Sequence, residues 1–93
     1  MSEKRLVVLA LDSCYATPGA MEHLSRMEIL GLLRKQALGD WGDTCSEDCA
    51  ANDAAVLSGD ARVVALHVVY EERFLVITEA DRSATTVMLA SEY

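Results

Sequence analysis

The stretch FLVITEADRSATTVML, residues 74–89, decides the fold of this 93-residue chain. Two apolar runs rich in β-branched residues flank a polar segment, residues 79–83, and this pattern predicts two strands joined by a tight connection. A third strand-like run, residues 62–70, precedes them across the charged turn at residues 71–73. We therefore expect an antiparallel meander of three strands. The side chains predicted to be buried in it are Phe74, Val76, Ile77, Val87 and Leu89.

The amino-terminal run RLVVLAL, residues 5–11, predicts a fourth strand. Because both of its faces are apolar, we expect this strand inside the sheet rather than at an edge. Asp12 and Ser13 are expected to end it, with Tyr15 and Ala16 as a brief continuation.

Two helix starts follow in the sequence. Thr17 before Pro18 combines a capping residue with a proline suited to the first helical position, and predicts a short helix over residues 18–24. Ser25 and Glu28 form an S-x-x-E capping box, which predicts a second helix running to about residue 37.

Residues 39–43, GDWGD, predict a loop around Trp41, the only tryptophan, which we expect in the core. Ser46 is the expected cap of an alanine-rich third helix over residues 47–57. The order of strand, helices and three strands predicts one α+β domain over residues 1–93. We expect a four-stranded, mainly antiparallel sheet with two or three helices packed on one face.

The formal net charge is −7, and acidic residues are concentrated between Gly39 and Gly59, where there is no lysine or arginine. This distribution argues against direct nucleic-acid binding, which needs clustered basic side chains. No apolar run reaches the roughly 20 residues that a membrane helix needs, and Asp12 interrupts the first run too early for a signal peptide. We expect a soluble cytoplasmic protein.

The three cysteines, Cys14, Cys45 and Cys49, do not suggest a disulfide framework, because their number is odd in a small intracellular chain. His23 and His67 lack the spacing of zinc ligands, so we expect no metal and no cofactor. Inert, packed thiols are favoured over a nucleophile, which would need a base beside it. The chain also lacks the common nucleotide-binding and hydrolase motifs.

The turn with Glu79, Asp81 and Arg82 is the densest cluster of candidate functional groups. Paired carboxylates and an arginine suit acid–base work, a magnesium site or partner binding. The interpretation we favour is a structural turn in which Asp81 and Ser83 bond the backbone and Arg82 pairs with a nearby acid.

The acidic segment offers a second candidate surface. Most such segments are solvated helix faces, but carboxylates can also imitate the phosphates of a nucleic acid and occupy a basic groove. The candidate partner-binding residues in this segment are Asp40, Asp43, Glu47, Asp48 and Asp53.

Several motifs together resemble a family of small bacterial proteins carried on plasmids and other mobile elements, usually called plasmid-related proteins. These motifs are ATPGA (residues 16–20), GDWG (39–42), ED (47–48), Asn52, TEADRSATT (78–86) and the terminal EY (92–93). The chain departs from the family pattern at Cys14, where glycine is expected, and its turn at residues 71–73 is shorter. The resemblance implies a setting on mobile DNA and no particular mechanism.

These observations favour a non-enzymatic acidic binding protein of a mobile element, whose most concrete form is an inhibitor of a host defence system, such as an anti-CRISPR. The expected partner is a protein, with a basic nucleic-acid-binding protein as the leading kind. The main alternative is a regulatory or accessory protein that acts by homodimerisation through an exposed sheet face. A remote alternative is an enzyme that uses Glu79, Asp81 and Arg82.

Overall fold

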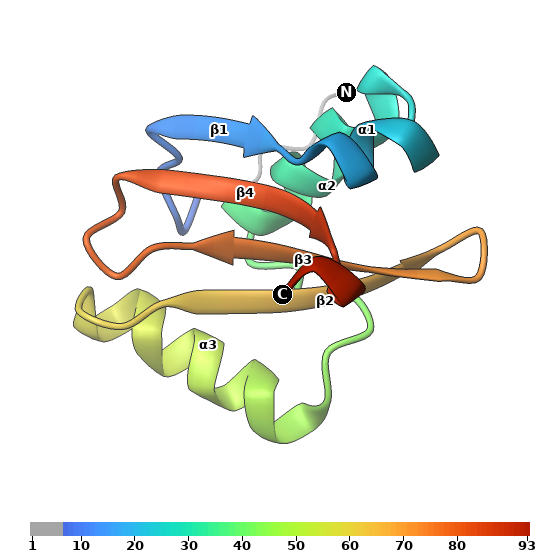
Figure 1. Ribbon diagram of the computed structural model, residues 1–93. Coiled ribbons are helices and arrows are strands. Elements are labelled where there is room, and N and C mark those ends of the chain that lie inside the picture. The colour runs from blue at the N-terminus through green and yellow to red at the C-terminus, as the bar shows by residue number, and fades with distance from the viewer. Residues whose placement is uncertain (1–6) are drawn as a thin grey trace, which may run out of the picture.

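The computed structural model describes residues 7–93, and it has the α+β architecture expected from the sequence. Four strands form one mixed, mostly antiparallel sheet in the order β1-β4-β3-β2. Helix α2 lies behind the sheet in Figure 1, and helix α3 runs beside β2. The elements are β1 (Ser13–Ala16), α1 (Pro18–His23), α2 (Arg26–Ala37), α3 (Ser46–Ser58), β2 (Val63–Val69), β3 (Glu72–Thr78), β4 (Ala84–Leu89) and the short 3-10 turn η1 (Ala90–Glu92).

The predicted meander is confirmed. β3 pairs antiparallel with both of its neighbours, and Val76 lies between Ala65 of β2 and Val87 of β4. The first connection is tighter than expected, because β3 already begins at Glu72. Only Tyr70 and Glu71 separate the two strands. Both have positive φ, as the two central residues of a type I′ hairpin turn require.

The prediction of a strand at residues 5–11 is wrong for the part of it that the structure describes. Its first two residues lie outside the described part of the chain, and residues 7–11 are not a strand. The amides of Val8 and Leu9 instead donate to the carbonyl of Ala37 at the end of α2, at 2.9 and 3.2 Å. Leu9 is therefore buried in the core although its segment is not part of the sheet.

The first strand is therefore β1, which begins at Ser13, the residue expected to break it. β1 pairs in parallel with β4 and forms an edge of the sheet, not its interior. The apolar pattern misled here because helix ends and loops can bury apolar side chains as well as a sheet can.

The helix caps were predicted well from local sequence. Thr17 accepts a hydrogen bond from the Ala20 amide and begins α1, and the Ser25–Glu28 capping box is complete at the start of α2. The third helix starts one residue early, with Cys45 at the cap position in place of Ser46 and with no side-chain capping bond.

The core lies on the helix-covered face of the sheet and has two parts. One packs α1 and α2 against β3 and β4, and the other packs Trp41, Leu9 and α3 against β2. Trp41 is buried, as predicted. Phe74, Val76, Ile77 and Val87 are buried as well, whereas Leu89 is partly buried.

The outer edge of β2 is closed by groups that come from outside the sheet. The Asn52 side chain binds both the amide and the carbonyl of Val64, and the Leu66 carbonyl accepts from the Asp43 amide. Thr44 Oγ1 accepts from the Leu66 amide at 2.8 Å. The Val68 amide donates to Asp43 Oδ2, also at 2.8 Å. Every second residue along this edge therefore has partners, and no strand can add to it without breaking them.

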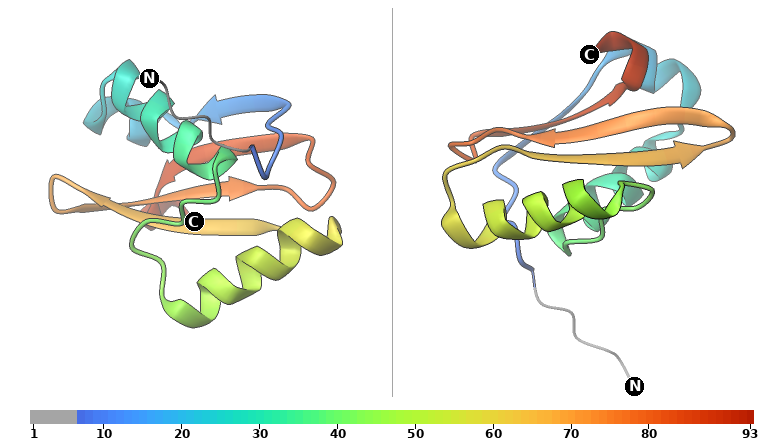
Figure 2. Two further views of the ribbon diagram at one scale, coloured as in Figure 1. Left: turned by 180° about the vertical axis from the view of Figure 1, so that it is seen from behind. Right: turned by 90° about the horizontal axis from the view of Figure 1, so that it is seen from below.

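The carboxyl-terminal turn lies on the opposite face of the sheet from α2 (Figure 2). There the Arg62 guanidinium donates to the Tyr93 hydroxyl at 2.6 Å and lies over its ring. The Glu92 carboxylate reaches the start of α1 and accepts from Thr17 Oγ1 at 2.6 Å and from the Leu89 amide at 2.8 Å. The end of the chain is thus tied both to β2 and to the first helix.

Candidate functional site

The structure divides the five carboxylates of the acidic segment into two groups. All five residues are exposed, but three of them accept hydrogen bonds from the fold and so help to shape the loop and dock α3. These bonds join Asp40 Oδ1 to the Gly42 amide (3.0 Å), Asp43 Oδ2 to the Val68 amide (2.8 Å) and Asp53 Oδ1 to the Trp41 indole nitrogen (2.9 Å).

The other two carboxylates, Glu47 and Asp48, are exposed in the first turn of α3. Negative charge at this position is stabilised by the helix dipole. Neither side chain hydrogen-bonds another residue among those that the structure describes. They are therefore the two members of the acidic segment that are most available to a partner.

Asp48 borders a groove that combines acidic and apolar groups. The floor is formed by Val64, Leu66 and Leu75 on the sheet face opposite α2, and the groove has a volume of about 290 Å³. The rim is formed by Asp43, Thr44, Cys45 and Asp48. A surface of this kind offers apolar contact together with carboxylates for a basic side chain.

Arg82, expected to pair with an acid, instead holds four backbone carbonyls. Nη2 donates to the Ala55 carbonyl near the end of α3 at 2.8 Å, and Nη1 donates to the Ala61 carbonyl at 2.7 Å. Nη1 also lies 3.1 and 3.2 Å from the carbonyls of Glu79 and Ala80. The guanidinium thus joins the β3–β4 turn to the end of α3, where the helix dipole favours a cation.

The remaining groups of this turn have a local role. Asp81 Oδ1 accepts from the Ser83 amide at 3.0 Å, as expected, and bonding by Ser83 lowers the pKa of Asp81 below its usual value. The Glu79 amide donates to the Ala84 carbonyl and closes the turn. Glu79, Asp81 and Arg82 are neighbours in the chain, but the arginine is directed towards α3.

Two polar side chains are buried under the helices. Gln36 of α2 donates through Nε2 towards Thr78 Oγ1 at 3.1 Å and two strand carbonyls. His67 of β2 lies against the backbone of Gly42, and burial lowers its pKa. Gln36 Oε1 and His67 Nε2 are buried without a hydrogen-bond partner among the described residues, and neither side chain lines the acidic groove.

The cysteines lie in different surroundings. Cys14 and Cys45 are exposed, so the expectation of packed thiols is wrong for these two. Cys49 is partly buried, and its thiol donates to the Thr44 carbonyl at 3.3 Å. Burial raises the pKa of Cys49, which disfavours its thiolate. Within residues 7–93 there is no cluster of three or more histidine, cysteine or carboxylate side chains that could hold a metal ion.

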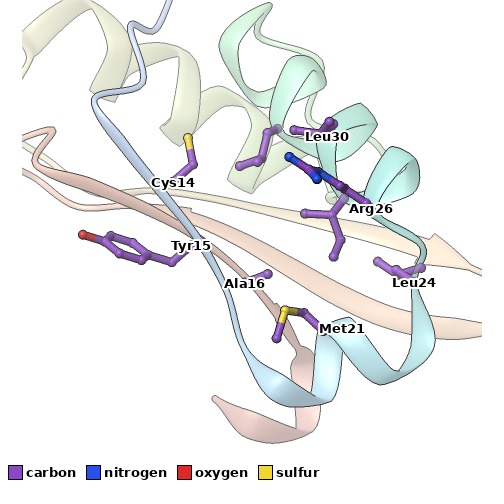
Figure 3. A pocket seen from close by; sticks show the side chains of 9 residues that line it. Cys14, Tyr15, Ala16, Met21, Leu24, Arg26 and Leu30 are labelled. Atoms are coloured by element: carbon purple, nitrogen blue, oxygen red, sulfur yellow. The ribbon is translucent and has the colours of Figure 1, made fainter.

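A mainly apolar pocket lies elsewhere, between β1 and the helices α1 and α2, with a volume of about 430 Å³ (Figure 3). Cys14, Met21, Arg26 and Leu30 are among the residues that line it. Sequence reasoning missed this pocket because the strand was placed at residues 5–11. It also missed Asn52, whose only signal is a polar, weakly helix-forming residue inside an alanine-rich helix.

Comparison with known proteins adds no relative: no family model, no curated protein and no solved structure matches this chain. In the part of the chain that the structure describes, no helix is both long and apolar enough to cross a membrane.

Proposed function

We propose that this chain is a non-enzymatic binding protein of a mobile genetic element, which contacts a basic protein partner through the acidic groove. Its most concrete form is an inhibitor of a host defence system whose partner normally binds nucleic acid. The observation that carries the proposal is the groove itself, where Asp43 and Asp48 lie beside the apolar side chains of Val64, Leu66 and Leu75.

The chemistry of the groove suits a protein partner better than a small molecule. Its floor is part of an open sheet face, and Glu47, which precedes Asp48 in the same turn of α3, is exposed. Apolar contact gives affinity, while the carboxylates select a basic partner and speed its approach. The setting on mobile DNA is supported by the resemblance of the GDWG and TEADRSATT motifs to plasmid-related proteins.

The geometry of the other candidate favours a structural role over catalysis. An enzyme using the β3–β4 turn would need Arg82 near the two carboxylates and open to substrate. Four carbonyls already occupy the guanidinium.

The test begins with capture of partners from a bacterial lysate on the immobilised protein, followed by binding kinetics with the purified partner. Changing Glu47→Lys and Asp48→Lys together should lower the association rate about tenfold or more at low salt, because it reverses two exposed charges in the first turn of α3, one of which borders the groove. The matched control is Glu71→Lys with Glu72→Lys, which changes the net charge equally at the exposed tip of the β2–β3 hairpin.

The control pair should lower the rate much less than the α3 pair. Equal binding by the native protein and the α3 pair would refute the acidic groove as the contact surface. Capture of only neutral or acidic proteins would refute the basic partner.

A further inference from the structure

The two edges of the sheet differ in how their backbone groups are used. Along β2, groups of Asn52, Thr44 and Asp43 occupy the outward amides and carbonyls, as described above. β1, at the other edge, has no such cover among the described residues. An uncovered edge strand is a template on which another strand can pair.

The outward groups of β1 belong to two residues. The Thr17 amide donates to the Val87 carbonyl at 3.0 Å, and the pairing of Ala16 with Val87 fixes the alternation along the ladder. The odd-numbered residues of β1 therefore bond β4, while the amides and carbonyls of Cys14 and Ala16 are directed away from the sheet. Within residues 7–93, no hydrogen bond reaches these four groups.

An apolar pocket borders the same edge. Figure 3 shows Cys14 and Ala16 facing the pocket from β1, with Met21 and Leu30 on the helix side. Met21 is 59% exposed and Leu30 is 50% exposed. Tyr15, on the other face of the strand, is 58% exposed. Open backbone groups and uncovered apolar side chains thus lie together.

We propose that a second copy of this chain pairs with this edge, β1 against β1 in antiparallel orientation, about a twofold axis at Tyr15. In this register Cys14 of each copy lies opposite Ala16 of the other. Each such pair exchanges two hydrogen bonds, so all the outward groups of both strands are satisfied. The two sheets become one of eight strands, with the apolar pockets side by side across the new pairing.

The outward backbone groups of β1 are complementary to those of a second β1, which is one argument for a second copy over an unrelated strand. β1 has only four residues, its two outward residues flank Tyr15 symmetrically, and the register leaves no outward group unpaired.

The distribution of charge is a second argument. Residues 12–38, which include β1, α1 and α2, carry three acidic and three basic side chains, so these elements have no net charge of their own to repel a copy. Residues 39–60 carry six acidic side chains and no basic one. They lie along β2, the edge farthest from β1. At about 4.8 Å per strand, the two acidic edges of the dimer are about 34 Å apart, several times the Debye length of about 8 Å.

This inference does not depend on the proposed function, because the acidic groove lies at the other edge and stays open in the dimer. The test is the mass in solution, measured by sedimentation equilibrium from about 10 µM to about 1 mM. We expect the mass of the native chain to rise from 10.1 kDa towards twice that value. Tyr15→Lys should keep the mass at the monomer value, because it places two like charges opposite each other at the axis.

The matched control is Val68→Lys, which puts the same charge on a half-exposed residue of β2, on the same sheet face as Tyr15. It should leave the dimer intact. A native chain that stays monomeric throughout the range overturns the proposal. So does a dimer that is dissociated by Val68→Lys and not by Tyr15→Lys, because that result places the contact on the open sheet face.

A second variant decides the matter if Tyr15→Lys fails to fold. In a background of Cys14→Ser and Cys45→Ser, Tyr15→Cys brings two thiols opposite each other at about 4.5 Å between Cα atoms, within reach of a disulfide. Mild oxidation should give a covalent dimer that reductant reverses. Val68→Cys in the same background should stay monomeric, and equal cross-linking of the two variants contradicts the proposed axis.

Discussion

The Asn52 side chain makes the two hydrogen bonds with Val64 that a residue of a neighbouring strand would make. Its Nδ2 donates to the Val64 carbonyl at 2.8 Å, and its Oδ1 accepts from the Val64 amide at 3.2 Å. One buried side chain on α3 thus satisfies both outward groups in the middle of an edge strand. Helix docking and edge protection depend on the same residue.

Asn52→Ala should therefore lower the free energy of unfolding by about 1–3 kcal/mol, because it leaves a backbone amide and a carbonyl without partners. Urea unfolding measures this loss. The variant should also aggregate faster than the native chain on warming, since the β2 edge is opened. Ala51→Ser, at the exposed neighbouring position, is the control and should change neither property. A neutral Asn52→Ala would show that water replaces the amide at no cost.

Arg82 should prove to be a stabilising residue. Arg82→Ala removes a charged donor from four carbonyls, and we expect a loss of about 2–3 kcal/mol in unfolding free energy. Arg82→Lys should recover less than half of it, because one ammonium cannot reach α3 and the turn together as the planar fork does. Full recovery by lysine in thermal unfolding would contradict this role. Asp81→Asn is the local control and should cost less than either.

Glu92 predicts a dependence of stability on acid. Bonding by the Thr17 hydroxyl and the Leu89 amide lowers its pKa in the folded chain from 4.5. The stabilisation is therefore complete above pH 4.5 and is lost as the pH falls through the lower folded value. Glu92→Gln should lower the melting temperature at pH 7, and the difference from the native chain should shrink below pH 4.5. Glu71→Gln, at an exposed carboxylate, should show no difference at either pH.

His67 and Gly42 form a contact that leaves no space for a side chain. A Cβ at Gly42 would lie 2.3 Å from His67 Nδ1, and the φ of Gly42 is +62°. Gly42→Ala should therefore destabilise the fold by more than about 1 kcal/mol, and thermal unfolding measures the effect. Gly31→Ala is the control, because nothing lies near its Cβ position and the helix should gain slightly.

The same histidine predicts a second pH effect. Burial lowers the pKa of His67 from its ordinary value of 6.5. As the pH falls below 6.5, His67 becomes protonated in the unfolded chain but stays neutral in the native chain. The free energy of unfolding therefore falls. His67→Gln should flatten the change in melting temperature between pH 7 and pH 5. An equal slope in the variant would assign this effect to another group.

The part of the fold that could be predicted depends on local chemistry. The apolar, β-branched runs within residues 74–89 give β3 and β4. The cap residues Thr17 and Ser25 give the helix starts, because their partners lie within a few positions. The run at residues 5–11 failed because apolar character alone does not distinguish a strand from a segment held against a helix end.

The candidate site was harder to predict for a related reason. Glu47 and Asp48 could be placed on an exposed helical turn from sequence. Asn52 and Arg82 hydrogen-bond backbone groups that lie 12 and 27 positions away in the sequence, and local patterns do not reveal such partners. Asp43 and Asp53 are exposed, as expected, but the sequence did not reveal that they accept hydrogen bonds from the β2 edge and from Trp41.

The parallel pairing of β1 with β4 also has a consequence for synthesis. Ser13 meets Ala84, and Ala16 meets Val87, so the earliest strand pairs with the latest. While the chain emerges from the ribosome, β1 has no neighbour in the sheet until residues 84–87 are made. Contacts this distant in sequence form late and make folding slow. Until then the edge of β1 that faces β4 in the folded chain is unpaired, and an unpaired strand edge is where mispairing starts.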